Sequence, residues 1–174
     1  MKQITNIYIL VDTSFRNERN KEKLQTILNK YSRALNFEKG KAKLHIIGYN
    51  DKAKIIEPFK RIATNGNPNL GEGLKLLESV IKYQRKYDEK QTRSVFILHG
   101  SDNILQGWNK PLERLFNLKE FAFGLRYVVQ YGNPDKYAKQ AFTRFTDSSE
   151  KILPYFSEGR LCSLVRHTAS KRVS

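Results

Sequence analysis

The chain has 174 residues, of which 39% are hydrophobic, including ten phenylalanines and nine tyrosines. This composition suits one packed α/β domain and excludes an intrinsically disordered chain. The longest apolar runs, such as Ile7–Val11, are too short to span a bilayer. The net charge of +15 comes from 32 basic and 17 acidic residues, and both halves of the chain are positive.

Two interpretations of this charge stay open: a lysine-rich solvated surface, or attraction to nucleic acid or to an acidic protein surface. No RNA-binding or helix-turn-helix signature accompanies the charge. The stretch Met1–Thr5 leads directly into a strand-like run and lacks the pattern of a secretory signal. A single cysteine, Cys162, cannot form an internal disulfide. A reducing, cytoplasmic setting is therefore expected.

The first half of the chain predicts three strands and two helices from its apolar periodicity. The strands are expected at Asn6–Asp12, Lys43–Tyr49 and Lys54–Phe59, and the helices at Asn20–Phe37 and along Leu70, Leu74, Leu77 and Ile81. The short link between the second and third strands predicts a hairpin. The third strand is therefore antiparallel and lies at an edge of the sheet.

The second half continues the alternation of strands and helices. Strands are expected at Arg93–Leu98, Tyr127–Tyr131 and Lys151–Leu153, and helices at Pro111–Leu118, from Asn133 to Phe145, and after Ser157 through Leu161, Leu164 and Val165. Asn133 is the predicted N-cap of the middle helix, with Pro134 in its first turn.

This alternation predicts a doubly wound α/β fold in a single domain over residues 1–174. Its central sheet is mostly parallel, with about six strands, one antiparallel edge strand and helices on both faces. Such sheets bind ligands at the carboxyl ends of their strands. The loops Asp12–Arg16, Asn65–Gly71 and His99–Asp102 are therefore expected to meet there.

Catalytic residue types occur in these loops without a catalytic motif. Asp12, Ser14 and His99 are the types that nucleophilic catalysis uses. However, Ser14 does not lie in a Gly-x-Ser-x-Gly elbow, and the glycines of the second loop lack the end of a phosphate-binding loop. A hydrolase remains a hypothesis that requires Ser14 and His99 within hydrogen-bond reach.

Several segments, in order along nearly the whole chain, resemble the von Willebrand factor type A family. Tyr8–Ser14 is similar to its opening Asp-x-Ser-x-Ser, Pro68–Leu74 to its Thr-x-Leu-Gly segment, and Val95–Gly100 to its apolar strand ending in Thr-Asp-Gly. Gly107-Trp108, Arg126–Gly132, Phe142–Asp147 and Leu164–Ser170 resemble the tellurium-resistance, TerY-like branch. The resemblance depends on the order and spacing of these segments together.

The resemblance implies a site for Mg²⁺ or a similar hard cation, built from five oxygen-bearing side chains. Asp12 and Ser14 match the family pattern, but Arg16 replaces the second serine, Pro68 the threonine and His99 the third-loop aspartate. A guanidinium repels a dication, and imidazole suits softer metals. The metal-ion-dependent adhesion site is therefore predicted to be degenerate, and no metal or other cofactor is expected.

The roles of four residues in or near this site remain open in the sequence. Arg16 either pairs with Asp12 in place of the cation or points to solvent. Asp102 could reach back toward the site, and Asn69 could add a carbonyl oxygen. Trp108 is either an exposed contact anchor or a lid over the edge of the core.

The leading functional hypothesis is a non-catalytic protein–protein interaction domain. The resemblance implies a bacterial stress-response system of the tellurium-resistance type, with a protein phosphatase or a protein kinase as partner. Nucleic-acid binding through the basic surface is the alternative. The predicted partner-binding residues are Asp12, Ser14, Arg16, Pro68, Asn69, His99, Asp102 and Trp108.

Overall fold

A computed structural model describes residues 4–36, 42–87, 93–154, 159, 160, 162, 163 and 166. Its centre is a six-stranded sheet in the order β3-β2-β1-β4-β5-β6. The strands are β1 (Thr5–Asp12), β2 (Ala42–Tyr49), β3 (Ala53–Ile56), β4 (Arg93–Gly100), β5 (Leu125–Gln130) and β6 (Ile152–Pro154). All neighbouring strands pair in parallel except β2 and β3. The predicted mostly parallel sheet with an antiparallel edge strand is confirmed.

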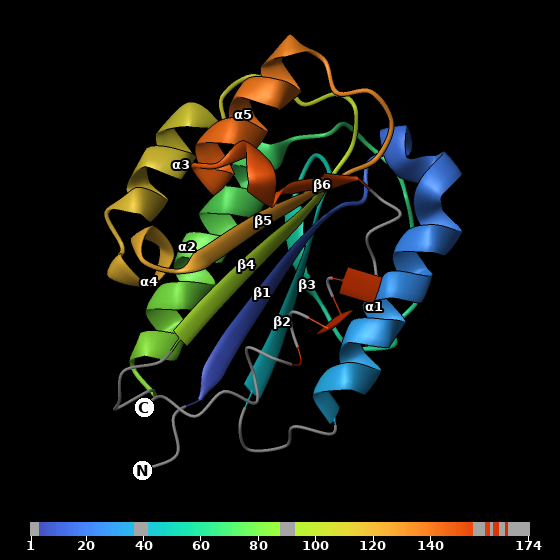
Figure 1. Ribbon diagram of the computed structural model, residues 1–174. Coiled ribbons are helices and arrows are strands. Elements are labelled where there is room, and N and C mark those ends of the chain that lie inside the picture. Colours follow the sequence, from blue (N-terminus) through green and yellow to red (C-terminus); the bar gives the residue numbers. More distant parts are fainter. Residues whose placement is uncertain are drawn as a thin grey trace.

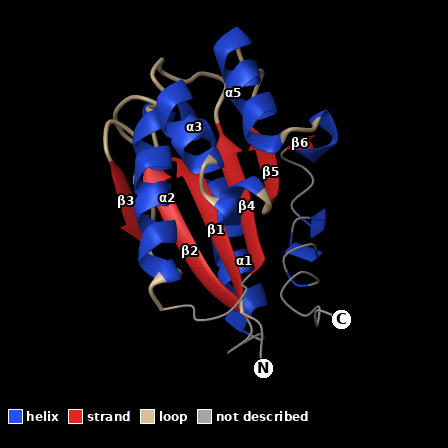
Figure 2. Ribbon diagram, turned by 90° about the vertical axis from the view of Figure 1, so that its left-hand side faces the viewer, coloured by secondary structure: helices blue, strands red, loops and turns tan. Residues whose placement is uncertain are grey.

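Helices cover both faces of this sheet (Figure 1). They are α1 (Lys21–Asn36), α2 (Leu70–Arg85), α3 (Asn109–Phe116), the short α4 (Lys119–Ala122) and α5 (Lys136–Thr146). Two 3-10 turns, Phe15–Asn20 and Ser149–Lys151, precede α1 and β6. Helix α1 lies on one face, and α2 to α5 lie on the other (Figures 1 and 2). Among the described residues there is no helix with the length and apolar character needed to span a bilayer.

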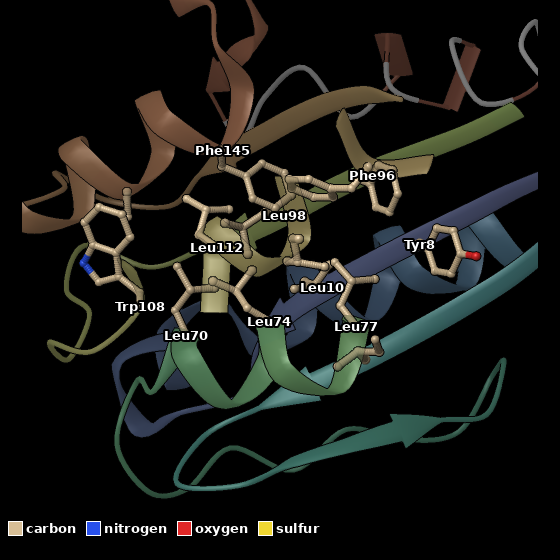
Figure 3. Packing of buried hydrophobic residues seen from close by; sticks show 14 of the residues in the cluster. Tyr8, Leu10, Leu70, Leu74, Leu77, Phe96, Leu98, Trp108, Leu112 and Phe145 are labelled. Atoms are coloured by element: carbon tan, nitrogen blue, oxygen red, sulfur yellow. The ribbon is translucent and has the colours of Figure 1, made fainter. Parts of the chain in front are cut away.

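Strand β1 separates two hydrophobic clusters because its side chains alternate between the faces. Ile7, Ile9 and Val11 pack with the apolar stripe of α1. Tyr8 and Leu10 pack with α2, α3 and α5, as Figure 3 shows. Such burial on both faces explains why a parallel strand reads as an almost continuous apolar run.

Several element boundaries differ from the sequence predictions. The N-cap of α5 is Asp135, whose carboxylate accepts a hydrogen bond of 2.8 Å from the Ala138 amide; the predicted cap, Asn133, was wrong. Strand β3 ends at Ile56, three residues early, and Phe59 adopts a positive φ of 65° in the turn beyond it. The predicted cap at Ser157 and the residues Leu161, Leu164 and Val165 lie outside the described residues.

Strand β4 is longer than predicted, and this change matters for the site. It continues through His99 to Gly100, and His99 pairs with Val11 on one side and Val129 on the other. His99 is therefore a strand residue whose side-chain direction is set by the pleat. The third loop begins only after Gly100.

Candidate functional site

The candidate site lies where the central strands β1 and β4 end side by side. The direction in which the chain adds strands to the sheet reverses between β1 and β4: β2 lies next to β1 on one side, and β5 lies next to β4 on the other. A doubly wound sheet opens a crevice at such a point. Asp12 is the last residue of β1, and its side chain is completely buried.

Two hydrogen bonds hold the Asp12 carboxylate. Oδ1 accepts from the Ser14 amide at 2.9 Å, and Oδ2 accepts from the hydroxyl of Ser101 in the third loop. The Ser101 hydroxyl also lies 2.9 Å from the Asn103 carbonyl oxygen. Burial raises the pKa of Asp12 above its ordinary value, and the hydrogen bonds from Ser101 and Ser14 only partly oppose that effect.

Backbone hydrogen bonds join the three loops to one another. The Phe15 amide donates to the Gly66 carbonyl at 3.0 Å, and the Asn65 amide donates to the Thr13 carbonyl at 3.0 Å. The Leu105 amide donates to the Pro68 carbonyl at 2.9 Å. The second loop is thus tied to the first and to the third, which confirms that the three stretches converge. Such a network fixes the shape of the edge in advance of binding.

His99 does not belong to this site, so the prediction that it occupies the third-loop ligand position is wrong. Its ring lies on the α1 face, with Nε2 3.1 Å from the Tyr31 hydroxyl and Nδ1 2.9 Å from the Tyr131 hydroxyl. Complete burial lowers the pKa of His99 to about 3, so the imidazole is neutral. With both ring nitrogens engaged, His99 has none left for Ser14, which removes the basis of the hydrolase hypothesis.

The Arg16 side chain points to solvent. It is exposed, and its guanidinium carbon lies 5.1 Å from the centroid of the Phe15 ring. The hydrogen bonds that reach the Asp12 carboxylate come from Ser14 and Ser101. The structure therefore supports the interpretation that Arg16 points to solvent, and not the interpretation that Arg16 pairs with Asp12.

The second-loop residues are placed mainly by their backbone. Pro68 is buried, and its carbonyl is engaged by the Leu105 amide. Asn69 is half-buried and precedes α2, and its backbone carbonyl accepts from the Glu72 amide at 3.2 Å. That bond is the ordinary start of a helix.

Asp102 lies against the loop that follows β5. Its carbonyl accepts from the Asp135 amide at 2.8 Å, and its side chain faces the position that a Cβ atom at Gly132 would occupy, 3.4 Å from the Asp102 Cβ. Its Oδ1 is buried and has no hydrogen-bond partner among the described residues. Asp102 therefore anchors α5 to the third loop.

Trp108 closes the edge of the larger hydrophobic cluster. Only 4% of the residue is exposed, and it packs in the cluster that contains Leu70 and Leu112 (Figure 3). Of the two interpretations of Trp108, the lid over the core is the one that fits this burial.

Sequence reasoning missed three residues of this edge. Ser101 supplies the hydroxyl that bonds to Asp12, while Phe15 and Leu105 are 51% and 39% exposed. A polar residue directly after a central strand is a usable signal for Ser101. An apolar residue in a polar loop is the corresponding signal for Phe15 and Leu105.

Buried polar atoms without partners gather near the end of β1. Among the described residues, the Ser14 Oγ and the Tyr49 hydroxyl accept and donate no hydrogen bond. Burial, and then the nearby Asp12 carboxylate, raise the pKa of the Tyr49 phenol well above its usual value. No group of three or more His, Cys, Asp or Glu side chains capable of holding a metal occurs within the described part of the chain.

Comparison with known proteins identifies the fold. No protein-family model and no curated protein matches the chain. Solved structures do match: a von Willebrand factor type A protein from Catenulispora acidiphila has a TM-score of 0.69 at 10% identity, covering 99% of this chain and 44% of that one. Manganese-loaded TRAP from Plasmodium vivax has a TM-score of 0.68 at 13% identity, covering 99% and 76%.

A pilus adhesin, SpaC from Lactobacillus rhamnosus GG, also matches, with a TM-score of 0.65 at 11% identity over 96% of this chain and 30% of its own. The chain therefore spans less than half the length of the Catenulispora protein and of the adhesin. The fold is that of von Willebrand factor type A domains. At identities this low, the likeness concerns the fold alone.

Proposed function

We propose that this chain is a non-catalytic protein–protein interaction domain that binds its partner through the exposed residues of the three joined loops. The proposal depends chiefly on one observation: the hydrogen-bonded loops leave two large apolar side chains in solvent. Phe15 and Leu105 are 51% and 39% exposed, although the edge around them is otherwise polar. Exposed apolar groups with a polar rim are typical of protein-binding surfaces.

Phe15 and Leu105 flank the same short segment. Their amides bond to the carbonyls of Gly66 and Pro68, which are two residues apart in the second loop. Two exposed apolar residues from distant parts of the sequence are thus held next to one loop by their backbones. The exposed Arg16 and Asn67 add charge and hydrogen-bonding capacity to the same edge.

We propose further that no metal ion bridges the partner, so the adhesion site is degenerate. Both Asp12 oxygens already accept hydrogen bonds, and Arg16 and Pro68 bring no side-chain oxygen. Among the described residues, the buried side-chain oxygens without partners belong to Ser14, Tyr49, Thr64, Ser94 and Asp102, and Asp102 is the one carboxylate in that set, whereas Mg²⁺ prefers a near-octahedral set of oxygen ligands. The residues present do not fit a hard-cation site.

The identity of the partner is proposed from the family resemblance alone. The tellurium-resistance branch implies a bacterial stress-response setting with a phosphatase or kinase as partner. A structural neighbour described as an adhesin agrees with a binding role. The pairing of both His99 nitrogens with tyrosines supports the absence of hydrolytic chemistry.

A capture experiment tests this function. The immobilised chain is incubated with a lysate of its source cells, and bound proteins are quantified for wild type, Phe15→Asp and Leu105→Asp, each with and without EDTA. We expect one major partner whose recovery falls about tenfold in either variant, since each places a charge in the centre of the contact. EDTA is expected to leave recovery unchanged.

Phe123→Asp is the matched control. Phe123 is 91% exposed and directly precedes the start of β5, so it lies at the amino ends of the parallel strands, away from the three loops at their carboxyl ends. Equal loss in all three variants would refute the loop surface. Loss of the partner on adding EDTA would refute the metal-independent contact.

A further inference from the structure

A second surface lies beyond the joined loops, in a groove between α5 and the beginning of α3. The groove has a volume of about 660 Å³. Its lining residues are Trp108, Asn109, Lys136, Lys139, Gln140, Thr143 and Arg144. Asn109 follows Leu105 by four residues, so the groove continues from the third loop.

The α5 side of the groove is one face of the helix. Lys136, Lys139, Gln140, Thr143 and Arg144 follow the spacing i, i+3, i+4, i+7 and i+8. Residues at this spacing project from the same side. Eight helical steps span about 12 Å, which is the length of about four residues of extended peptide.

The cations of this face are only weakly neutralised by carboxylates. Among the described residues, no acidic group forms an ion pair with Lys136 or Lys139, and the closest to Arg144 is Glu113 at 3.9 Å. The outer face of α2 and α3 is different. There Lys75, Lys82, Arg85 and Arg114 pair with Glu72, Glu78 and Glu120 at 2.5–3.1 Å. Positive charge is therefore available in the groove and largely compensated beside it.

Arg144 is held in a defined position within the groove. Its Nη1 donates to the Asn109 Oδ1 at 2.8 Å, and its guanidinium carbon lies 5.7 Å from the centroid of the Trp108 ring. A guanidinium fixed in this way loses little freedom when it binds a carboxylate with its other N–H groups. The neutral amides and hydroxyl of Asn109, Gln140 and Thr143 match the polar backbone of a peptide.

The groove lining fits carboxylates better than nucleobases. Binding of single-stranded nucleic acid depends on exposed aromatic rings on which bases stack. Trp108 is the aromatic residue in the lining, and it is 96% buried by its own packing, with 4% exposed. The groove therefore offers positive charge to a ligand, but no exposed aromatic ring on which a base could stack.

We propose that this groove binds an acidic segment of the protein partner, a run of Asp or Glu residues in extended conformation. The inference depends on the proposed function, because the acidic segment belongs to the protein that the joined loops bind. It assigns Lys136, Lys139 and Arg144 a role in recognition that is separate from Phe15 and Leu105.

Binding of a fluorescein-labelled octaglutamate peptide, followed by anisotropy at low salt and at 0.15 M salt, tests the groove directly. Trp108 is the single tryptophan of the chain, so its fluorescence reports occupancy of the groove independently. We expect saturable binding that weakens about tenfold in the double variant Lys136→Glu, Lys139→Glu. Lys54→Glu, which reverses an exposed charge on β3 at the edge of the sheet, is expected to bind within twofold of wild type.

Each other outcome overturns the groove proposal. No saturable binding, or equal weakening by Lys54→Glu, would show that the groove is not a site. Tighter binding of a fluorescein-labelled oligothymidylate, lost in the groove double variant, would identify nucleic acid as the ligand. Phe15→Asp must leave peptide binding unchanged, so failure of the groove and failure of the loop surface are distinguishable. Thermal unfolding of each variant verifies that it folds.

Discussion

The two faces of the sheet differ at the point where β1 and β4 end. On the α1 face, His99 is buried, neutral and bonded through both ring nitrogens to Tyr31 and Tyr131. At the end of β1, on the side of α2, Asp12 is equally buried. Among the described residues no cation pairs with its carboxylate, and the Tyr49 hydroxyl has no hydrogen-bond partner. The polar groups around His99 are hydrogen-bonded to one another, whereas the buried charge of Asp12 lowers the stability of the folded state.

This difference supports the proposal that the polar groups around Asp12, and not those around His99, correspond to a binding site. A buried polar group that serves stability is normally paired, and unpaired groups demand another explanation. The Asp12 cluster occupies the place where the family resemblance expects a cation. We therefore expect changes on the α1 face to destabilise the fold, and neutralisation of Asp12 to stabilise it.

The largest effect is expected from His99→Ala. The change leaves a cavity and removes a hydrogen-bond partner from each of two buried tyrosine hydroxyls, so the free energy of unfolding should fall by about 2–4 kcal/mol. Urea unfolding followed by circular dichroism measures this change. The half-buried His45 on β2 provides the control. An equal loss of stability in His45→Ala would show that the hydrogen bonds of His99 to Tyr31 and Tyr131 are not the cause of the effect.

The next effect is a dependence of stability on pH that originates at His99. The unfolded chain takes up a proton near pH 6.5, whereas the folded pKa of His99 is about 3. His99 therefore contributes its full stability above pH 6.5, and that contribution falls by up to about 1.4 kcal/mol per pH unit as the pH drops from 6.5 toward 3.

Asp12 acts with the opposite sign, because burial raises its pKa and the folded state takes up the proton first. Its contribution therefore increases as the pH falls through the folded pKa. Urea unfolding of wild type and His99→Gln between pH 4 and 7 separates the two residues. A slope below pH 6.5 that persists undiminished in His99→Gln would rule out His99 as its source.

A smaller, stabilising effect is expected from Asp12→Asn. The side-chain oxygen still accepts from the Ser14 amide, and the new amide group donates to Ser101, whose hydrogen can then point to the Asn103 carbonyl. Removing the buried charge should raise the free energy of unfolding by about 1 kcal/mol. Asp135→Asn, which keeps a good N-cap on α5, is expected to change little. A destabilised Asp12→Asn variant would mean that the carboxylate charge is compensated in the native state.

The architecture could be predicted from the sequence because the alternation of strands and helices and the periodicity of apolar residues are visible in short stretches of the chain. The buried run Asn6–Asp12 and the helical stripe through Leu74 and Leu77 are local patterns that packing preserved. The site was harder, because the extension of β4 by two residues moved His99 onto the other face of the sheet. The pairing of Ser101 with Asp12 spans 89 positions and depends on the register of two strands, which no local pattern encodes.

Thermal unfolding in the presence of MgCl₂ or MnCl₂ tests whether hydrogen bonds between the loops, and not a cation, organise the proposed binding surface. Wild type and Asp12→Asn are compared from zero to millimolar metal. We expect no metal-dependent rise of Tm in wild type, and a higher Tm for Asp12→Asn at every metal concentration. A saturable rise of Tm in wild type that is absent in Asp12→Asn would contradict this expectation.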